Sequence, residues 1–182
     1  MKIHILFIIT IIISLLLFLA FSRPSKSKIQ IGQKAPEFEL YNQNEDSISL
    51  SQYKGKNLIV YFFPKAFTPG WTKQACGFRD QYEIYHKYNI EIIGISYDSR
   101  KKQKEFSQRY NLSFPLLSDS DAKVSKLYGV DTFFFPKRVT FLINRDGVVF
   151  HIIKNVSLDN YAEKIIKIFK ENNLTINLND KK

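Results

Sequence analysis

The residues that could do chemistry gather in one stretch, YFFPKAFTPGWTKQACGFRD (residues 61–80). An apolar run ends at Pro64, a Thr-Pro-Gly turn follows, and helical spacing begins near Thr72. A side chain at position 71 would lie in the first helical turn, where unpaired backbone N–H groups and the helix dipole favour an anion. A thiol there would ionise readily and attack an electrophile. The residue present is Trp71, which has no nucleophilic chemistry.

Three other residues could support such a site. Thr68 could offer a hydroxyl, Pro64 stiffens the approach to the turn, and Arg138 opens a later strand that could bring a fixed positive charge beside it. The chain has one cysteine, Cys76, which excludes an intrachain disulfide, a Cys-x-x-Cys pair and a thiolate metal site. In the second helical turn the dipole's help is fading. Two interpretations of Cys76 therefore stay open: a sole nucleophile, or a small, partly buried residue without a role in chemistry.

Metal, nucleotide and nucleic-acid chemistry are not indicated. The three histidines lie far apart in the sequence, and no P-loop or dinucleotide fingerprint occurs. We expect no metal and no cofactor. The formal net charge is +10, but the densest basic stretch, residues 99–109, is interpreted as the solvated face of a helix. We expect no nucleic-acid partner.

Alternation of strands and helices, followed by a hairpin and a last helix, predicts an α/β fold with a mixed sheet. The expected strands are residues 57–63, 91–98, 114–119, 138–144 and 148–153, with short extended pieces at 38–40 and 47–53. The expected helices are residues 72–88, 101–111, 121–130 and 157–173, the last capped by Ser157 or Asp159. Function is expected beyond the carboxyl end of strand 57–63, where open α/β sheets bind ligands.

The first 22 residues read as a membrane segment, with an apolar run from Ile5 to Ala20 or Phe21. We favour an uncleaved anchor over a cleaved signal peptide, although Ala20 and Ser22 fit a cleavage site. Residues 23–28 form a polar linker, residues 29–173 the globular domain, and residues 174–182 a loose tail. The expected location is the membrane, with the domain exported; the positive-inside tendency leaves the cytoplasmic side open.

The stretch 61–80 resembles the active-site segment of the peroxiredoxins, and most closely that of their Q-type or bacterioferritin comigratory protein branch. The family motif is P-x-x-x-T-x-x-C, in which Pro64 and Thr68 fill the first two places and Trp71 the place of the peroxidatic cysteine. Cys76 aligns with the resolving cysteine of many Q-type members, and Arg138 with the active-site arginine. The resemblance extends over about residues 29–172 and implies a thioredoxin-like fold.

The resemblance implies a thiol-dependent reduction of hydrogen peroxide or organic hydroperoxides. In that family the first thiolate becomes a sulfenic acid, and the second cysteine forms a disulfide that thioredoxin or a similar thiol reduces. The expected partners are therefore a peroxide, a thiol reductant and a membrane, and we expect a monomer. The alternative is a catalytically inactive, membrane-tethered member that binds a ligand or a partner.

Trp71 leaves three interpretations open. The indole could plug the pocket and stack on Arg138 as a cation–π pair. Alternatively, an apolar mouth could face the bilayer, built from the phenylalanines Phe62, Phe63, Phe67, Phe133, Phe134 and Phe135. Finally, the letter itself could stand for a recoded selenocysteine or a one-base change from cysteine, which would restore a two-thiol peroxidase.

Overall fold

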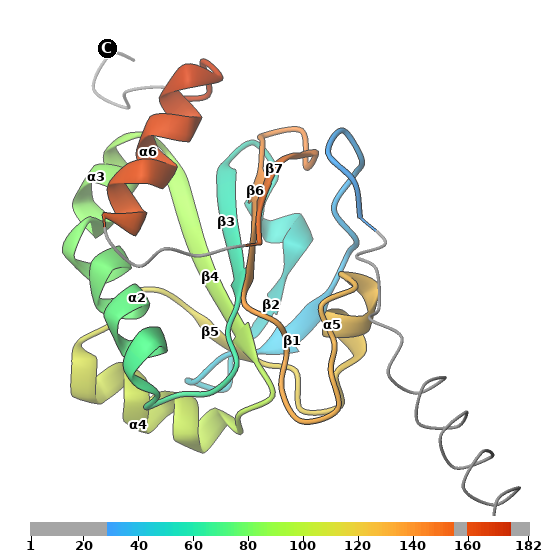
Figure 1. Ribbon diagram of the computed structural model, residues 1–182, viewed down its shortest axis with the longest axis vertical. Helices are drawn as coiled ribbons and strands as arrows, with labels where there is room; N and C mark the ends of the chain where they lie inside the picture. The colour runs from blue at the N-terminus through green and yellow to red at the C-terminus, as the bar shows by residue number, and fades with distance from the viewer. Residues whose placement is uncertain (1–28, 155–159, 176–182) are drawn as a thin grey trace, which may run out of the picture.

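The computed structural model describes residues 29–154 and 160–175, and its centre is a five-stranded sheet in the order β5-β4-β3-β6-β7 (Figure 1). The strands are β3 (Asn57–Phe62), β4 (Ile90–Ser96), β5 (Leu116–Ser118), β6 (Val139–Ile143) and β7 (Val149–Ile153). β3, β4 and β5 run parallel, whereas β6 is antiparallel to both β3 and β7. The predicted mixed sheet is confirmed.

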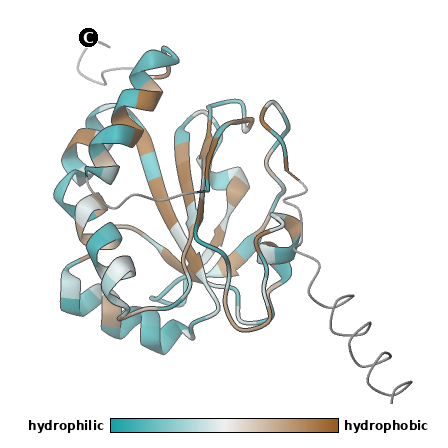
Figure 2. Ribbon diagram, in the orientation of Figure 1, coloured by the Kyte–Doolittle hydropathy of each residue, from teal (hydrophilic) through white to brown (hydrophobic). Residues whose placement is uncertain are grey.

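Four helices cover one face of the sheet and a smaller layer covers the other (Figure 1). The first layer holds α2 (Pro69–Asp80), α3 (Tyr82–Lys87), α4 (Arg100–Tyr110) and α6 (Tyr161–Glu171). The second holds α5 (Lys123–Leu127), the 3-10 helix η1 (Leu50–Tyr53) and the hairpin of β1 (Glu39–Tyr41) and β2 (Ser47–Ser49). Figure 2 shows hydrophobic residues along the central strands and hydrophilic residues on the outward surface of the helices.

β3 is buried along its whole length because each of its faces packs against one of these layers. Since side chains alternate along a strand, Ile59, Tyr61 and Phe63 point into the cluster beneath α2 and α6. Leu58, Val60 and Phe62 point into the cluster beneath α5. This arrangement explains why the sequence of β3 is a continuous apolar run, the pattern that predicted a strand buried on both faces.

The single helix predicted over residues 72–88 is wrong at its start and in its middle. Helix α2 begins at Pro69, three residues earlier, because proline fits the first helical position and Thr68 supplies the extended N-cap backbone. The helix then breaks at Gln81, and α3 follows as a separate element. The Tyr85 hydroxyl donates to the carbonyl of Ala162 at 2.6 Å, which anchors α3 to α6. Apolar spacing runs through both helices, so the sequence pattern alone did not show the break.

The remaining predicted elements shift by a few residues at their ends. The piece predicted over 47–53 is β2 followed by η1, and α6 begins at Tyr161 with Asn160 as its N-cap. The predicted cap residues Ser157 and Asp159, and the apolar segment within residues 1–22, lie outside the described residues. Among the residues that are described, no helix is both long and apolar enough to cross a membrane.

Candidate active site

The first turn of α2 is built to hold negative charge. Pro69 occupies the first helical position, and the Thr72 N–H donates to the Thr68 carbonyl at 2.9 Å. Helical geometry leaves the N–H groups of Gly70 and Trp71 without an acceptor inside the helix. The Thr68 hydroxyl donates to the Lys65 carbonyl at 2.9 Å, which keeps its oxygen lone pairs available as acceptors. The predicted position of this turn, directly after β3, is confirmed.

A carboxylate that the sequence analysis missed fixes the loop before this turn. Asp98 accepts a hydrogen bond from the Ala66 N–H at 2.6 Å and forms an ion pair with Lys102 at 2.8 Å. Ser96 also donates to Asp98, at 3.3 Å. Asp98 follows β4, the parallel neighbour of β3, so both carboxyl ends meet at one edge of the sheet. That position was the signal that could have identified it.

Arg138 lies beside the turn, as predicted. Its Nη1 donates to the Gly70 carbonyl at 3.3 Å, which joins the start of β6 to the first turn of α2. Partial burial lowers the pKa of the Arg138 guanidinium, which nevertheless stays a cation in the physiological range. Thr68, Gly70 and Arg138 therefore form one cluster that favours an anion.

Tyr161 is a second residue near Arg138 that the sequence did not reveal. Its hydroxyl donates to the Thr140 hydroxyl at 2.6 Å, and burial raises its pKa to about 12. The positive charge of Arg138 partly opposes this effect, because it lowers the pKa of the phenol. The sequence predicted Tyr161 on the apolar stripe of α6, and its ring does lie in the core. A periodic pattern does not show where its hydroxyl points.

Trp71 points inward from the first turn and is fully buried. Its ring stacks on Phe63 with centroids 3.7 Å apart and on Tyr61 at 4.8 Å. Phe106 of α4 packs on it at 5.8 Å. The expected cation–π stack on Arg138 is wrong, since none of the described cation–π contacts involves either residue. Aromatic neighbours surround the indole because α2 turns this position toward the sheet.

The space around the indole is tightly filled. The indole N–H and the Tyr61 hydroxyl are both buried and have no hydrogen-bond partner among the described residues. Gly94 of β4 makes room for Tyr61, because a Cβ at that position would lie 2.5 Å from the phenol oxygen. A buried donor without an acceptor costs about 1–3 kcal/mol. The aromatic stacking and burial of Trp71 offset that cost.

Cys76 lies on the outer side of α2 and is half-buried. It lies five positions after Trp71, so at 100° per residue the two side chains point to different sides of the helix. The charged neighbours of Cys76 at helical spacing are Lys73, Arg79 and Asp80, and Arg79 forms an ion pair with Asp80 at 2.7 Å. The pKa of the Arg79 guanidinium is raised, first by its hydrogen bond to Asp80 and also by the Cys76 side chain. The Arg79 Nη1 donates to the Tyr110 carbonyl at 2.9 Å, which ties this position to α4.

The predicted aromatic mouth is assembled only in part. Phe63 packs on Trp71 and Phe67 packs edge-on against Phe106, both on the α2 side of the sheet. Phe62 is wrong as a mouth residue, because it points into the cluster on the other face with Tyr128 and Phe141. Phe67 is itself partly exposed, and three further exposed phenylalanines, Phe133, Phe134 and Phe135, lie in the loop before Arg138.

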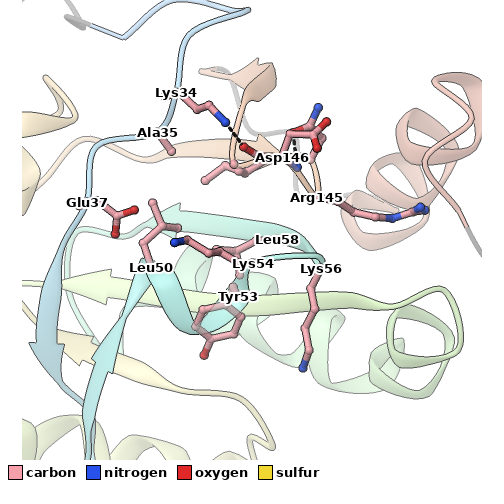
Figure 3. Close-up of a pocket in the computed structure, with 13 residues that line it drawn as sticks. Lys34, Ala35, Glu37, Leu50, Tyr53, Lys54, Lys56, Leu58, Arg145 and Asp146 are labelled. Atoms are coloured by element: carbon pink, nitrogen blue, oxygen red, sulfur yellow. Dashed lines mark hydrogen bonds between the residues drawn. The ribbon is translucent and has the colours of Figure 1, made fainter.

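A cavity of about 570 Å³ lies away from this turn, near the start of β3 and the β6–β7 turn. Figure 3 shows Leu50, Leu58 and Ala35 on its walls and the lysines Lys34 and Lys54 among its polar groups. The Lys34 ammonium donates to the Asp146 carbonyl across one side. None of the residues at the first turn of α2 lines this cavity, so it does not belong to the candidate active site.

Comparison with known proteins identifies the family of the chain. The AhpC/TSA family model matches residues 31–152. The chain is 43% identical to the putative peroxiredoxin bcp of Coxiella burnetii over 146 residues, which is 76% of this chain and 97% of the relative. It is 46% identical to peroxiredoxin Q of Oryza sativa subsp. japonica over 131 residues, covering 70% of this chain and 60% of that longer protein.

Solved structures give the same result. Peroxidoxin BcpB of Mycobacterium tuberculosis matches with a TM-score of 0.74 and 32% identity, over 79% of this chain and 97% of that one. PrxQ of Xylella fastidiosa matches with a TM-score of 0.77 and 26% identity, over 81% of this chain and 99% of the other. The thioredoxin-like α/β fold that the sequence predicted is thereby confirmed. The chain belongs to the AhpC/TSA family and, within it, to the peroxiredoxin Q and bcp group.

Proposed function

We propose that this protein is a thiol-dependent peroxidase that reduces hydrogen peroxide or organic hydroperoxides. The observation that carries the proposal is the joining of Thr68, Gly70 and Arg138 at the first turn of α2 in a chain of the peroxiredoxin Q and bcp group. The two free amides of the turn and the guanidinium favour an anionic substrate or product at the first turn of α2.

We further propose that Trp71 occupies the place of the family's peroxidatic cysteine, which leaves Cys76 as the reacting thiol. The Cys76 thiolate attacks one peroxide oxygen, the O–O bond breaks, and the departing alkoxide or hydroxide takes a proton to leave as alcohol or water. Sulfur is oxidised to sulfenic acid and the peroxide is reduced by the same two electrons. Support comes from the partial exposure of Cys76 and from the neighbouring Arg79.

A chain with one cysteine needs an outside reductant to complete the cycle. The thiolate of thioredoxin or of a small thiol attacks the sulfenic acid and releases water, which leaves a mixed disulfide. A second thiol then displaces Cys76 and leaves as the oxidised disulfide. This proposed cycle uses no cofactor.

The proposed location is the membrane. The apolar run is long enough to act as an anchor when Ile3 is included, and the polar linker of residues 23–28 connects it to the domain. We propose that the segment stays attached and that the domain is exported. Fractionation of cells, with protease added to either side of the membrane, tests both statements.

The deciding experiment measures hydrogen peroxide consumption by the full chain with thioredoxin, thioredoxin reductase and NADPH. The codon at position 71 and the intact protein mass are checked first. We expect turnover that Cys76→Ser abolishes. Gly77→Ala is the matched control: it changes the adjacent position on the same helix, where an added Cβ would meet nothing within 4 Å, and should keep the activity.

Each result has a distinct meaning. Activity that survives in Cys76→Ser would refute the assignment of the thiol. No turnover in either form, with tryptophan verified at position 71, would refute the peroxidase and leave the alternative of a binding protein. A mass that shows cysteine or selenocysteine at position 71 would restore a two-step cycle in which Cys76 resolves the oxidised residue.

A further inference from the structure

We propose that the loop of residues 131–137 inserts into the surface of a lipid bilayer and orients the domain on it. This loop, called the phenylalanine loop here, connects α5 to β6 at the lower end of the molecule in Figure 1, the end where α2 begins. It exposes Phe133 by 82%, Phe134 by 77% and Phe135 by 47%. Three consecutive exposed phenylalanines are unusual on a water-facing surface, where apolar side chains are normally scattered singly.

The loop holds its phenylalanines outward by a closed network of hydrogen bonds. The Lys137 N–H donates to the Val130 carbonyl at 2.7 Å, which closes the base of the loop. Inside it, the Thr132 hydroxyl donates to the Phe135 carbonyl and accepts from the Phe135 N–H at 3.4 Å. The Tyr97 hydroxyl donates to the Thr132 carbonyl at 3.5 Å. These bonds fix the loop backbone in the conformation in which the three rings are exposed.

The charges beside the loop fit an anionic lipid surface. Between residues 124 and 138 the sequence has three cations, Lys126, Lys137 and Arg138, against one carboxylate, Asp131, whereas Lys123 is paired with Asp121 at 2.6 Å. Basic residues next to exposed aromatic rings are the composition of segments that lie at the membrane interface. Phenylalanine rings enter the acyl boundary, while lysine and arginine stay at the level of the headgroups.

The chain's own N-terminal segment argues for a bilayer rather than for a protein partner. The linker of residues 23–28 has six residues, which span at most about 20 Å when fully extended. Ile29, where the domain begins, belongs to the same core cluster as Val130 at the base of the loop. A domain on so short a tether stays within about 20 Å of the membrane surface, which favours contact with the bilayer. This step rests on the proposed anchor and is independent of the peroxidase activity.

One consequence concerns access to the candidate active site. Arg138 follows the loop directly and contacts the Gly70 carbonyl at the first turn of α2. Insertion of the loop would therefore bring this turn to the depth of the headgroups. Hydroperoxides that arise on lipid chains would then reach the protein from the bilayer rather than from water.

Spin-label accessibility in vesicles tests the proposal. The full chain, with Cys76→Ser to remove the native thiol, carries Phe134→Cys modified with a nitroxide and is reconstituted into vesicles of zwitterionic and anionic phospholipid. We expect the label at position 134 to collide more with oxygen, which concentrates in lipid, than with a water-soluble nickel chelate. Lys54→Cys is the control position, because it borders the distant cavity in Figure 3 and should favour the nickel chelate.

A second variant separates insertion from simple crowding. Phe133→Ser with Phe135→Ser should shift the label at position 134 toward the nickel chelate, while circular dichroism stays unchanged. Equal accessibility at positions 134 and 54 would overturn the proposal, and so would a label shielded from both reagents, which would indicate a protein partner or a second copy. If the chain does not float with the vesicles, the anchor and the loop insertion both fail, whereas the peroxidase assay is unaffected.

Discussion

At the scale of single residues, Trp71 puts the largest side chain in the protein at the first turn of α2, beside the polar groups that favour an anion. The indole satisfies the demands of packing through its stacking on Phe63 and Tyr61. Its N–H, however, has no hydrogen-bond acceptor among the described residues. The surrounding polar groups still favour an anion. Position 71 is therefore well packed, but its neutral indole does not use the neighbouring polar groups that favour an anion.

Trp71→Cys should create peroxidase activity or raise it strongly. A thiol at this position would gain the two free amides of the first turn and the nearby Arg138. The same change removes a large buried ring, and such truncations cost about 3–5 kcal/mol of unfolding free energy. Release of the unpaired indole N–H returns about 1–3 kcal/mol. Peroxide consumption and urea unfolding measure the two effects.

Trp71→Phe is the control for that experiment. It keeps an apolar ring, but it removes the unpaired N–H and leaves a smaller side chain in the buried site. The cavity cost and the relief of the unpaired donor oppose each other, so the free energy of unfolding should change little and the activity should stay at the level of the parent chain. An inactive Trp71→Cys that is folded by circular dichroism would contradict the prediction, because it would show that the remaining groups of the turn no longer support the chemistry.

Asp98 should stabilise the loop before α2 through its negative charge. Its side chain is only 7% exposed and pairs with Lys102, while it accepts the Ala66 N–H. Asp98→Asn keeps the shape and loses the charge, and weakening such a charged hydrogen bond should cost about 1–3 kcal/mol. Faster hydrogen exchange of the Ala66 amide should accompany the loss. Asp131→Asn is the control, because it makes the same substitution in the phenylalanine loop and should leave the hydrogen-exchange rate of the Ala66 amide unchanged.

At the scale of elements, the sequence predicted where the strands lie better than where the helices end. β3, β4 and β6 are apolar runs bounded by turn residues, and each lies within one or two residues of its predicted position. The break at Gln81 between α2 and α3 depends on tertiary contacts, including the hydrogen bond of Tyr85 to α6. Periodicity records which side chains are buried, and it continues across a break that keeps the same buried face.

Gly77 lowers the stability of α2, although no close contact requires a glycine at this position. It lies inside the helix, and a Cβ built on it would meet nothing within 4 Å. Gly77→Ala should therefore raise the free energy of unfolding by about 0.5–1 kcal/mol, because alanine loses less conformational freedom in a helix. Thermal or urea unfolding measures the gain. A loss of stability would mean that the glycine serves a conformation of α2 other than the one described.

At the scale of the whole molecule, the sequence predicted several residues of the candidate site but not which distant residues the fold brings next to them. The sequence identified Pro64, Thr68 and Arg138, and the structure confirms that Arg138 reaches the turn from a strand nearly seventy positions away. Asp98 and Tyr161 were missed because their roles arise from the meeting of separate strands and helices. The assignment of Phe62 and Phe63 to opposite faces follows from strand alternation, once the position of β3 is known.

The buried tyrosines predict an alkaline limit to stability. Burial raises the pKa of Tyr161 to about 12, and it raises the pKa values of Tyr61, Tyr85 and Tyr128 well above the ordinary range. In the unfolded chain these phenols ionise near pH 10. Between that pH and the higher folded values, the unfolded state binds fewer protons than the folded state, so the free energy of unfolding falls as the pH rises.

The domain should therefore unfold cooperatively above about pH 11. Each of the four phenols lowers the free energy of unfolding by about 1.4 kcal/mol per pH unit, and together they approach the 5–15 kcal/mol that stabilises an ordinary domain. Circular dichroism and tyrosinate absorbance should change together. Tyr161→Phe should make the pH dependence shallower, since it removes one of the phenols whose pKa burial raises. Ionisation of all ten tyrosines near pH 10, with the fold intact, would show that burial does not hold these phenols in their neutral form.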